Sequence, residues 1–174
     1  MYSIGDLIVH ESTGVCKITD ICVPEFMTGE KRHLCYMIRP VFGKNTVIYT
    51  PVDSDKVFLR PVMTKEMAMS YLGRIAQEEV DTIQAKKSAE LEDKYRKAMK
   101  NTTCYDLMKL QRSILKRRRE CVADGRVVSQ VDDKYYKNLK KLISEELSIA
   151  LEIPVEQVGD FIGDYVKDKE FLLV

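Results

Sequence analysis

The hydrophobic period of the chain changes near residue 62, and this change limits what the chain can fold into. Before that point, short apolar and β-branched runs predict strands at 4–10, 14–21, 33–39, 46–50 and 56–60, with Gly-, Asn-, Asp- and Ser-rich turns between them. Beyond it, apolar residues recur every three or four positions, as in helices. The sequence therefore predicts an α+β protein: a small SH3/Tudor-like β-barrel at 1–62, followed by an all-α helical domain at 63–174.

Capping residues indicate where the helices begin. Thr64 is an N-cap candidate for the first helix, and a second helical stretch is expected over roughly 78–100. Thr103–Asp106 and Ser129–Asp132 both have the capping-box pattern, in which an acidic residue follows the cap by three positions. Pro154 is expected to begin a last short helix.

Signatures of catalysis, metal binding and membrane insertion are missing from the sequence. No phosphate-binding loop, dinucleotide fingerprint, zinc-protease motif or nucleophile elbow occurs, and His10 and His33 lie in predicted strands. The five cysteines are odd in number and form no CxxC pair, so they are expected to be reduced packing residues. No apolar run is long enough to span a membrane, and the N-terminus lacks signal-peptide character. We therefore expect a cytoplasmic, non-enzymatic protein without a cofactor, a metal, a small-molecule substrate or a membrane partner.

The near-neutral net charge of +1 hides a strong polarity along the chain. Residues 85–119 contain twelve Lys and Arg against four acidic residues, whereas 142–174 contain eight acidic residues against two lysines. The basic segment has two interpretations: a solvated helix end, or a face that contacts nucleic-acid phosphates. The candidate phosphate contacts are Lys86, Lys87, Arg112, Lys116, Arg117, Arg118, Arg119, Lys134 and Lys137.

A series of short motifs occurs in a characteristic order. They are IGDLIV at 4–9, STGV at 12–15, GE at 29–30, YMIRP at 36–40, IYTPV at 48–52 and LRPV at 59–62, with KYYKNLKKLISEEL at 134–147 in the helical half. This order resembles the CarD/CdnL family of bacterial transcription regulators, whose N-terminal module is shared with transcription-repair coupling factor. The resemblance covers the chain to about residue 150.

The resemblance implies a non-enzymatic regulator that docks on the RNA polymerase β subunit by pairing its barrel edge with a polymerase strand. By position, the polymerase-binding residues are Glu25, Met27, Val47, Ile48 and Tyr49. Glu25 and Tyr49 replace basic side chains that family members often carry, so the contact is expected to differ in detail.

The resemblance also implies that the helical domain contacts promoter DNA near the melted region. Ser88 falls where many family members carry a Trp that wedges into the minor groove, and this chain contains no Trp. Contact with DNA is therefore expected to be weak and driven by phosphates. The alternative is a protein-interaction adaptor of the same fold that does not bind DNA.

Overall fold

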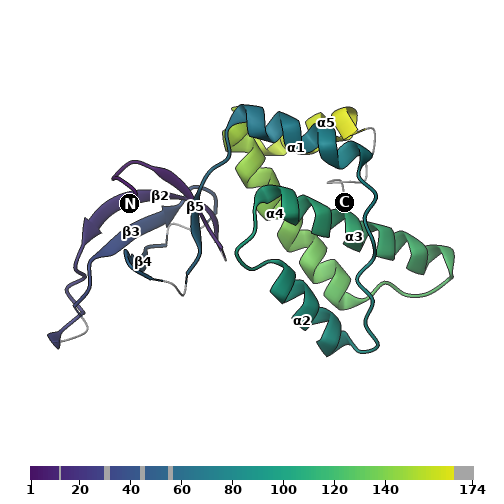
Figure 1. Cartoon of the computed structure of the whole chain (residues 1–174), viewed down its shortest axis with the longest axis horizontal. Helices are drawn as coiled ribbons and strands as arrows, with labels where there is room; N and C mark the ends of the chain where they lie inside the picture. The colour runs from purple at the N-terminus through teal and green to yellow at the C-terminus, as the bar shows by residue number, and fades with distance from the viewer. Residues whose placement is uncertain (12, 30–31, 44–45, 55–56, 167–174) are drawn as a thin grey trace. The chain divides into compact units, whose positions relative to one another are not determined.

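The computed structural model describes residues 1–11, 13–29, 32–43, 46–54 and 57–166. The chain divides into two compact units, Met1–Val62 and Met63–Val174, which can be followed by colour in Figure 1. Each unit is described by itself.

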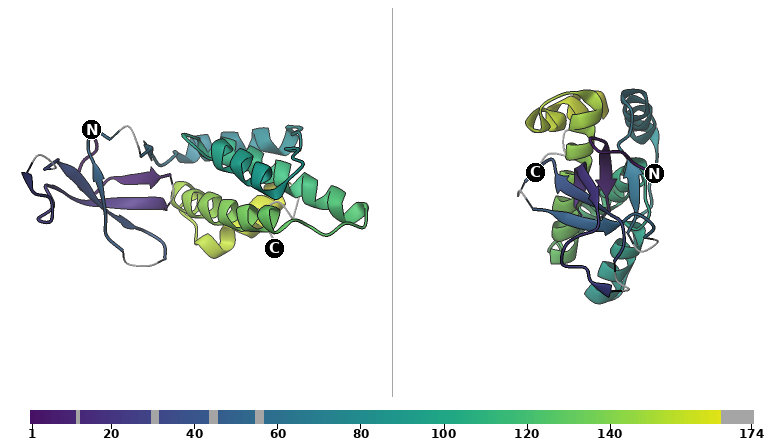
Figure 2. Two further views of the ribbon diagram at one scale, coloured as in Figure 1. Left: turned by 90° about the horizontal axis from the view of Figure 1, so that it is seen from below. Right: turned by 90° about the vertical axis from the view of Figure 1, so that its left-hand side faces the viewer.

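Unit 1 is a curled antiparallel sheet of five strands, which confirms the predicted small β-barrel type of fold. The strands are β1 (Leu7–His10), β2 (Gly14–Cys22), β3 (Cys35–Pro40), β4 (Ile48–Pro51) and β5 (Leu59–Pro61). Their order in the sheet is β4-β3-β2-β1-β5, so β4 and β5 form its two edges. The strands cross at an angle in the views of Figure 2, as expected for a strongly twisted sheet.

The core of unit 1 is small and lies on one face of the sheet. Its buried residues are Ile8, Cys16, Ile18, Tyr36 and Ile38. Tyr2 secures the N-terminus against this core, because its backbone N–H donates to the Tyr36 hydroxyl at 3.0 Å and its own hydroxyl donates to the carbonyl of Leu59 at 3.2 Å.

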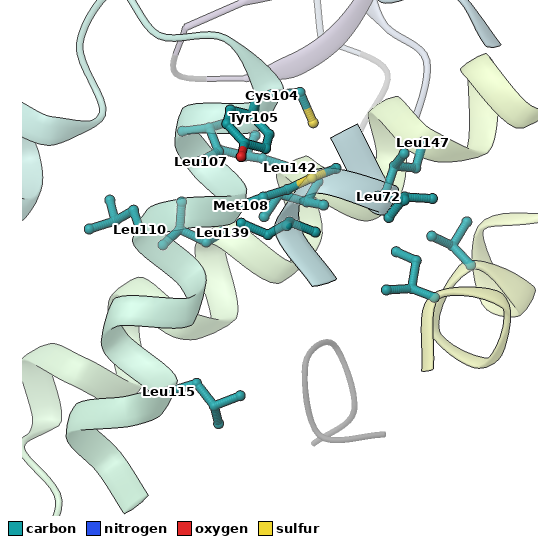
Figure 3. Packing of buried hydrophobic residues seen from close by; sticks show 14 of the residues in the cluster. Leu72, Cys104, Tyr105, Leu107, Met108, Leu110, Leu115, Leu139, Leu142 and Leu147 are labelled. Carbon is teal, nitrogen blue, oxygen red and sulfur yellow. The ribbon is translucent and has the colours of Figure 1, made fainter. Parts of the chain in front are cut away.

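Unit 2 is built around one central helix. Its helices are α1 (Lys65–Gln77), α2 (Ser88–Ala98), α3 (Cys104–Ala123), α4 (Gln130–Leu151) and α5 (Val155–Val166). The other four helices all contact α4. Consequently, 142–148 are buried on every side of α4, and Leu139 and Leu142 of α4 lie with Leu72, Leu107 and Met108 in the core drawn in Figure 3.

Two of the predicted helix starts are confirmed in full. The Thr64 side chain accepts from the N–H of Met67, and Thr103 and Asp106 form a complete capping box. The second predicted box is only half right: Ser129 caps α4 by accepting from the N–H of Val131, whereas Asp132 is completely buried. Asp132 is bonded to side chains of α2 and α3 instead, because a buried carboxylate requires polar partners.

The expected helix over 78–100 is wrong in its first half, because only Ser88–Ala98 is helical. The 79–87 segment has no regular secondary structure, and side chains from other elements donate to several of its carbonyl groups. Lys116 Nζ donates to the carbonyl of Val80 at 3.1 Å, Ser113 Oγ to that of Asp81 at 2.7 Å, and Lys94 Nζ to that of Gln84 at 2.7 Å. Tertiary donors thus replace the backbone bonds that a helix would supply.

None of the helices in the described part of the chain is both long enough and apolar enough to cross a membrane.

The burial of Glu145 on α4 predicts a pH-dependent cost to stability. Burial raises the pKa of this carboxyl, partly offset by Lys141, whose Nζ lies 3.8 Å away. Because the pKa of this carboxyl in the folded state lies above its unfolded value of about 4.3, its contribution to stability is greatest at acid pH and is lost as pH rises through the folded pKa.

Glu145→Gln should therefore raise the free energy of unfolding at about pH 7 but give no gain at about pH 4. Urea unfolding at both pH values measures this difference. The control is Glu79→Gln at an exposed position, which should leave the free energy of unfolding unchanged at both pH values. A gain that is equal at both pH values would contradict the electrostatic explanation.

Candidate functional site: the β4 edge and the basic helical surface

The backbone of β4 is paired on one side only among the described residues. Its register with β3 places Ile48 opposite Ile38, Tyr49 opposite Met37 and Thr50 opposite Tyr36. The next pair along, Val52 with Leu34, is hydrogen-bonded, with the Val52 N–H donating to the Leu34 carbonyl at 2.9 Å. Bonded and non-bonded pairs alternate in an antiparallel ladder, so Thr50 and Ile48 bond toward β3 and Tyr49 directs its N–H and C=O away from the sheet. Pro51 has no N–H, which leaves Tyr49 as the residue of β4 that offers both a donor and an acceptor at the edge.

Side-chain alternation places Tyr49 on the face of the sheet opposite the core. Ile48 packs against the core of unit 1 and Thr50 is buried, so Tyr49 between them faces outward. Its ring meets the ring of Phe26 edge to face, with centroids 5.4 Å apart and planes at 77°. Phe26 is 69% exposed and Val47 is 39% exposed. With Met37, the cross-strand neighbour of Tyr49, these residues make up what we call the β4 patch: Phe26, Met37, Val47 and Tyr49.

The predicted polymerase-binding residues therefore lie in or beside one structural feature. Val47 and Tyr49 belong to the β4 patch and Ile48 lies between them, with its side chain toward the core. Glu25 is exposed and Met27 is half-buried, on either side of Phe26 in the loop after β2. Phe26 was not named as a contact from the sequence, although it lies between the predicted residues Glu25 and Met27. An aromatic residue within a turn between Pro24 and Gly29 is the signal that could have identified it.

In unit 2, α3 uses three of its predicted phosphate contacts to hold other parts of the fold: Lys116, whose Nζ donates to the carbonyl of Val80, and the two arginines Arg112 and Arg117. Arg112 donates to the carbonyl of Ile75 at the end of α1. Arg117 donates through NH1 to the carbonyl of Ile83 at 3.4 Å. Both bonds occupy guanidinium donors that a phosphate would need.

Arg117 is also part of a buried network that joins three helices. Its Nε lies 3.2 Å from Oδ2 of Asp132, and the Tyr95 hydroxyl donates to Oδ1 of the same carboxylate at 2.7 Å. Asp132 is completely buried, and the Arg117 side chain is only 17% exposed. Burial and the hydrogen bond to Asp132 raise the pKa of Tyr95 well above its ordinary value. This network connects α2, α3 and α4.

Two more of the predicted contacts are ion-paired within unit 2. Arg118 pairs with Asp133 and lies over the ring of Tyr136, with its Cζ 4.8 Å from the ring centroid. Lys134 pairs with Glu92 of α2 at 2.6 Å.

The remaining predicted contacts are exposed and come from three different helices or their starts. Lys86, Lys87 and Ser88 are exposed at the start of α2, and Lys137 is exposed on α4. Arg119 lines an open hollow of about 490 Å³ together with Arg112 and Lys116, and with Glu79 and Glu120. Because acidic and basic side chains both line this hollow, it is not a strongly positive groove.

The structure brings together no metal-binding cluster among the residues that it describes. No group of three or more His, Cys, Asp or Glu side chains could hold a metal ion there. His10 is buried in β1, which lowers the pKa of its imidazole, and His33 is exposed. All five cysteines are free thiols, four of them buried.

Comparison with known protein families identifies unit 1. Residues 2–63 match the family model described as the CarD-like/TRCF RID domain. This is an RNA-polymerase-interacting module, a protein-interaction domain and not a catalytic one, and it supports a transcription-related role. No curated protein matches the chain.

The buried network predicts that the arginines of α3 differ greatly in their effect on stability. Arg117→Met leaves the Asp132 carboxylate buried without its cation, so the free energy of unfolding should fall by roughly 3–5 kcal/mol. The control is Lys134→Met, which removes an ion pair whose lysine is 67% exposed. Its loss should stay below about 1 kcal/mol. Urea unfolding followed by far-UV circular dichroism measures both, and equal losses in the two variants would contradict the structural role of Arg117.

Proposed function

We propose that this chain, whose residues 2–63 form a CarD-like/TRCF RID domain, is a non-enzymatic regulator of bacterial transcription that docks on the β subunit of RNA polymerase through the β4 edge. The observation that carries the proposal is the one-sided pairing of β4 within a domain of this family. An unpaired edge offers a row of backbone donors and acceptors to a strand of another protein.

The docking contact is centred on Tyr49. Its N–H and C=O point away from β3, so an incoming strand exchanges both hydrogen bonds with this residue. Val47 and Ile48 continue the strand, and the loop with Glu25 and Met27 lies beside it through the contact of Phe26 with Tyr49. The backbone bonds supply affinity, and the neighbouring side chains supply specificity.

A pair of substitutions at Tyr49 tests the docking edge. Tyr49→Ala removes the ring and keeps the outward backbone N–H. Tyr49→Pro removes the ring and the backbone N–H. Because the donor points outward, the proline should leave the β3–β4 ladder intact and weaken binding to purified RNA polymerase by about a further tenfold relative to the alanine variant. Biolayer interferometry measures both affinities, and circular dichroism checks that the variants fold. Equal binding by the proline and alanine variants would place the docking surface elsewhere.

The second part of the proposal is a weak contact of unit 2 with promoter DNA, driven by phosphates. Lys86, Lys87 and Ser88 support it, because they are exposed together at the N-terminus of an eleven-residue helix. The two ammonium groups can reach a phosphate, whereas the backbone N–H of Lys86 already donates to the Glu90 carboxylate at 3.1 Å. Arg119 and Lys137 are exposed and can add further phosphate contacts, whereas the Lys116 ammonium is also exposed but already donates to the carbonyl of Val80.

Reversal of the two lysines tests the DNA contact without disturbing the buried network. Lys86→Glu with Lys87→Glu should weaken binding to all duplex sequences by a similar factor and reduce the log–log salt slope by about two. A matched variant, Lys17→Glu with Lys65→Glu, changes the net charge equally at two exposed lysines outside the predicted basic face. Fluorescence anisotropy at several salt concentrations measures both variants. If the two variants behave alike, only net charge matters and no contact at α2 exists.

A second candidate function is a protein-interaction adaptor that does not bind DNA. The internal bonds of Arg112, Arg117, Arg118 and Lys134 favour it, since each of these side chains already has a partner within unit 2. The same anisotropy experiment separates the two functions, because the adaptor shows no salt-dependent binding to DNA.

A further inference from the structure

The β4 patch identifies the chemistry of the partner strand, on the premise that the proposed docking is correct. We infer that the partner places an apolar side chain, and not an acidic one, opposite Tyr49, where it packs against Phe26. The contact is then hydrophobic in its side chains and hydrogen-bonded in its backbone.

The geometry of strand pairing brings the two side chains together. Tyr49 directs its backbone groups outward, so one residue of an added strand lies directly opposite it. Side chains of directly opposite residues lie on the same face, with Cβ atoms about 4.5–5.5 Å apart. On that face, Tyr49 already contacts Phe26. The partner side chain therefore meets both rings.

Two side chains of the β4 patch are exposed apolar groups that an added strand could cover. Phe26 is 69% exposed and Val47 is 39% exposed, although both belong to a unit whose core is small. Exposed aromatic side chains next to a strand edge are typical of residues that dominate binding energy in interfaces.

The charges near the patch do not favour an acidic partner residue. None of the four patch residues is charged, and the neighbouring charges are of both signs: Asp20 is paired with Met37, Glu25 precedes Phe26, and Arg39 follows Met37 on the same face of β3. An acidic side chain opposite Tyr49 would lose its hydration and gain no cation from the patch. An apolar β-branched or aromatic side chain would gain from burial and from cross-strand packing.

An extended strand is the occupant that satisfies both features of this edge. A helix laid on the patch could cover Phe26 and Val47, but its own backbone bonds are internal and would leave the outward N–H of Tyr49 without a partner. A strand covers the rings and completes the ladder.

Substitutions at Phe26 test the inference in the full chain against purified RNA polymerase. Phe26→Ala should weaken binding about tenfold, and Phe26→Arg should weaken it at least as much. The matched control is Phe161→Ala, which removes a 37% exposed phenyl ring that stacks on Tyr165 of α5. This control should leave binding unchanged.

Salt dependence supplies a second, independent measurement. A hydrophobic side-chain contact should keep the wild-type affinity within about threefold between about 50 mM and 500 mM KCl, because salt screens charges and does not weaken apolar burial. Tighter binding by Phe26→Arg, or a wild-type affinity that falls steeply with salt, would overturn the inference in favour of an acidic partner. An unchanged affinity of Phe26→Ala would overturn it as well.

The outcome at Tyr49 keeps this inference separate from the proposed function. If Tyr49→Pro binds less tightly than Tyr49→Ala while Phe26→Ala binds like the wild type, then docking stands and the apolar partner residue is wrong. If the wild-type chain does not bind polymerase, the proposed function fails, and the inference fails with it.

Discussion

The arrangement of α2, α3 and α4 depends on the buried pairing of the Asp132 carboxylate with Arg117 and Tyr95. A completely buried charge is tolerated only when it is paired and hydrogen-bonded, and Asp132 obtains both from Arg117 and Tyr95. Because the three residues come from α4, α3 and α2, satisfying this one charge sets the positions of three helices relative to each other. Arg117 extends the network to the carbonyl of Ile83 and so helps to hold the 79–87 segment against α3.

The same network changes the interpretation of the basic run at 116–119 of α3, which the sequence suggested as a phosphate-binding face. Consecutive cations on a helix suggest a phosphate-binding face, yet successive positions of a helix point in different directions. Arg117 points inward to Asp132, and Arg118 lies over Tyr136 beside Asp133. Much of the positive charge between 85 and 119 therefore stabilises unit 2 itself. In unit 1, by contrast, the β4 edge carries an outward backbone donor at Tyr49 and the exposed ring of Phe26 among the residues that the structure describes.

Local rules were sufficient wherever neighbouring residues decide the outcome. Thr103 and Asp106 form their capping box because both partners lie within one turn, and the strand period of the first sixty residues reports the curled sheet. The same reasoning failed at 78–87, where a helix was expected. The donors that bond to this segment come from Ser113, Lys116 and Arg117, which are about thirty residues away in the chain. Phe26 was not singled out for a related reason, because its contact with Tyr49 joins the β2–β3 loop to β4.

The sequence by itself indicated the class of the fold and the change from sheet to helices near residue 62, because both follow from the hydrophobic period. The order of its short motifs indicated the family whose model matches residues 2–63, and the edge around Tyr49 was expected only from that resemblance. Only the tertiary structure decided which charges face solvent. Whether a side chain such as Arg117 is a surface cation or a buried counter-ion depends on what lies across from it, and its partner Asp132 is on another helix. That pairing is set by packing around α4 and leaves no trace in the local pattern.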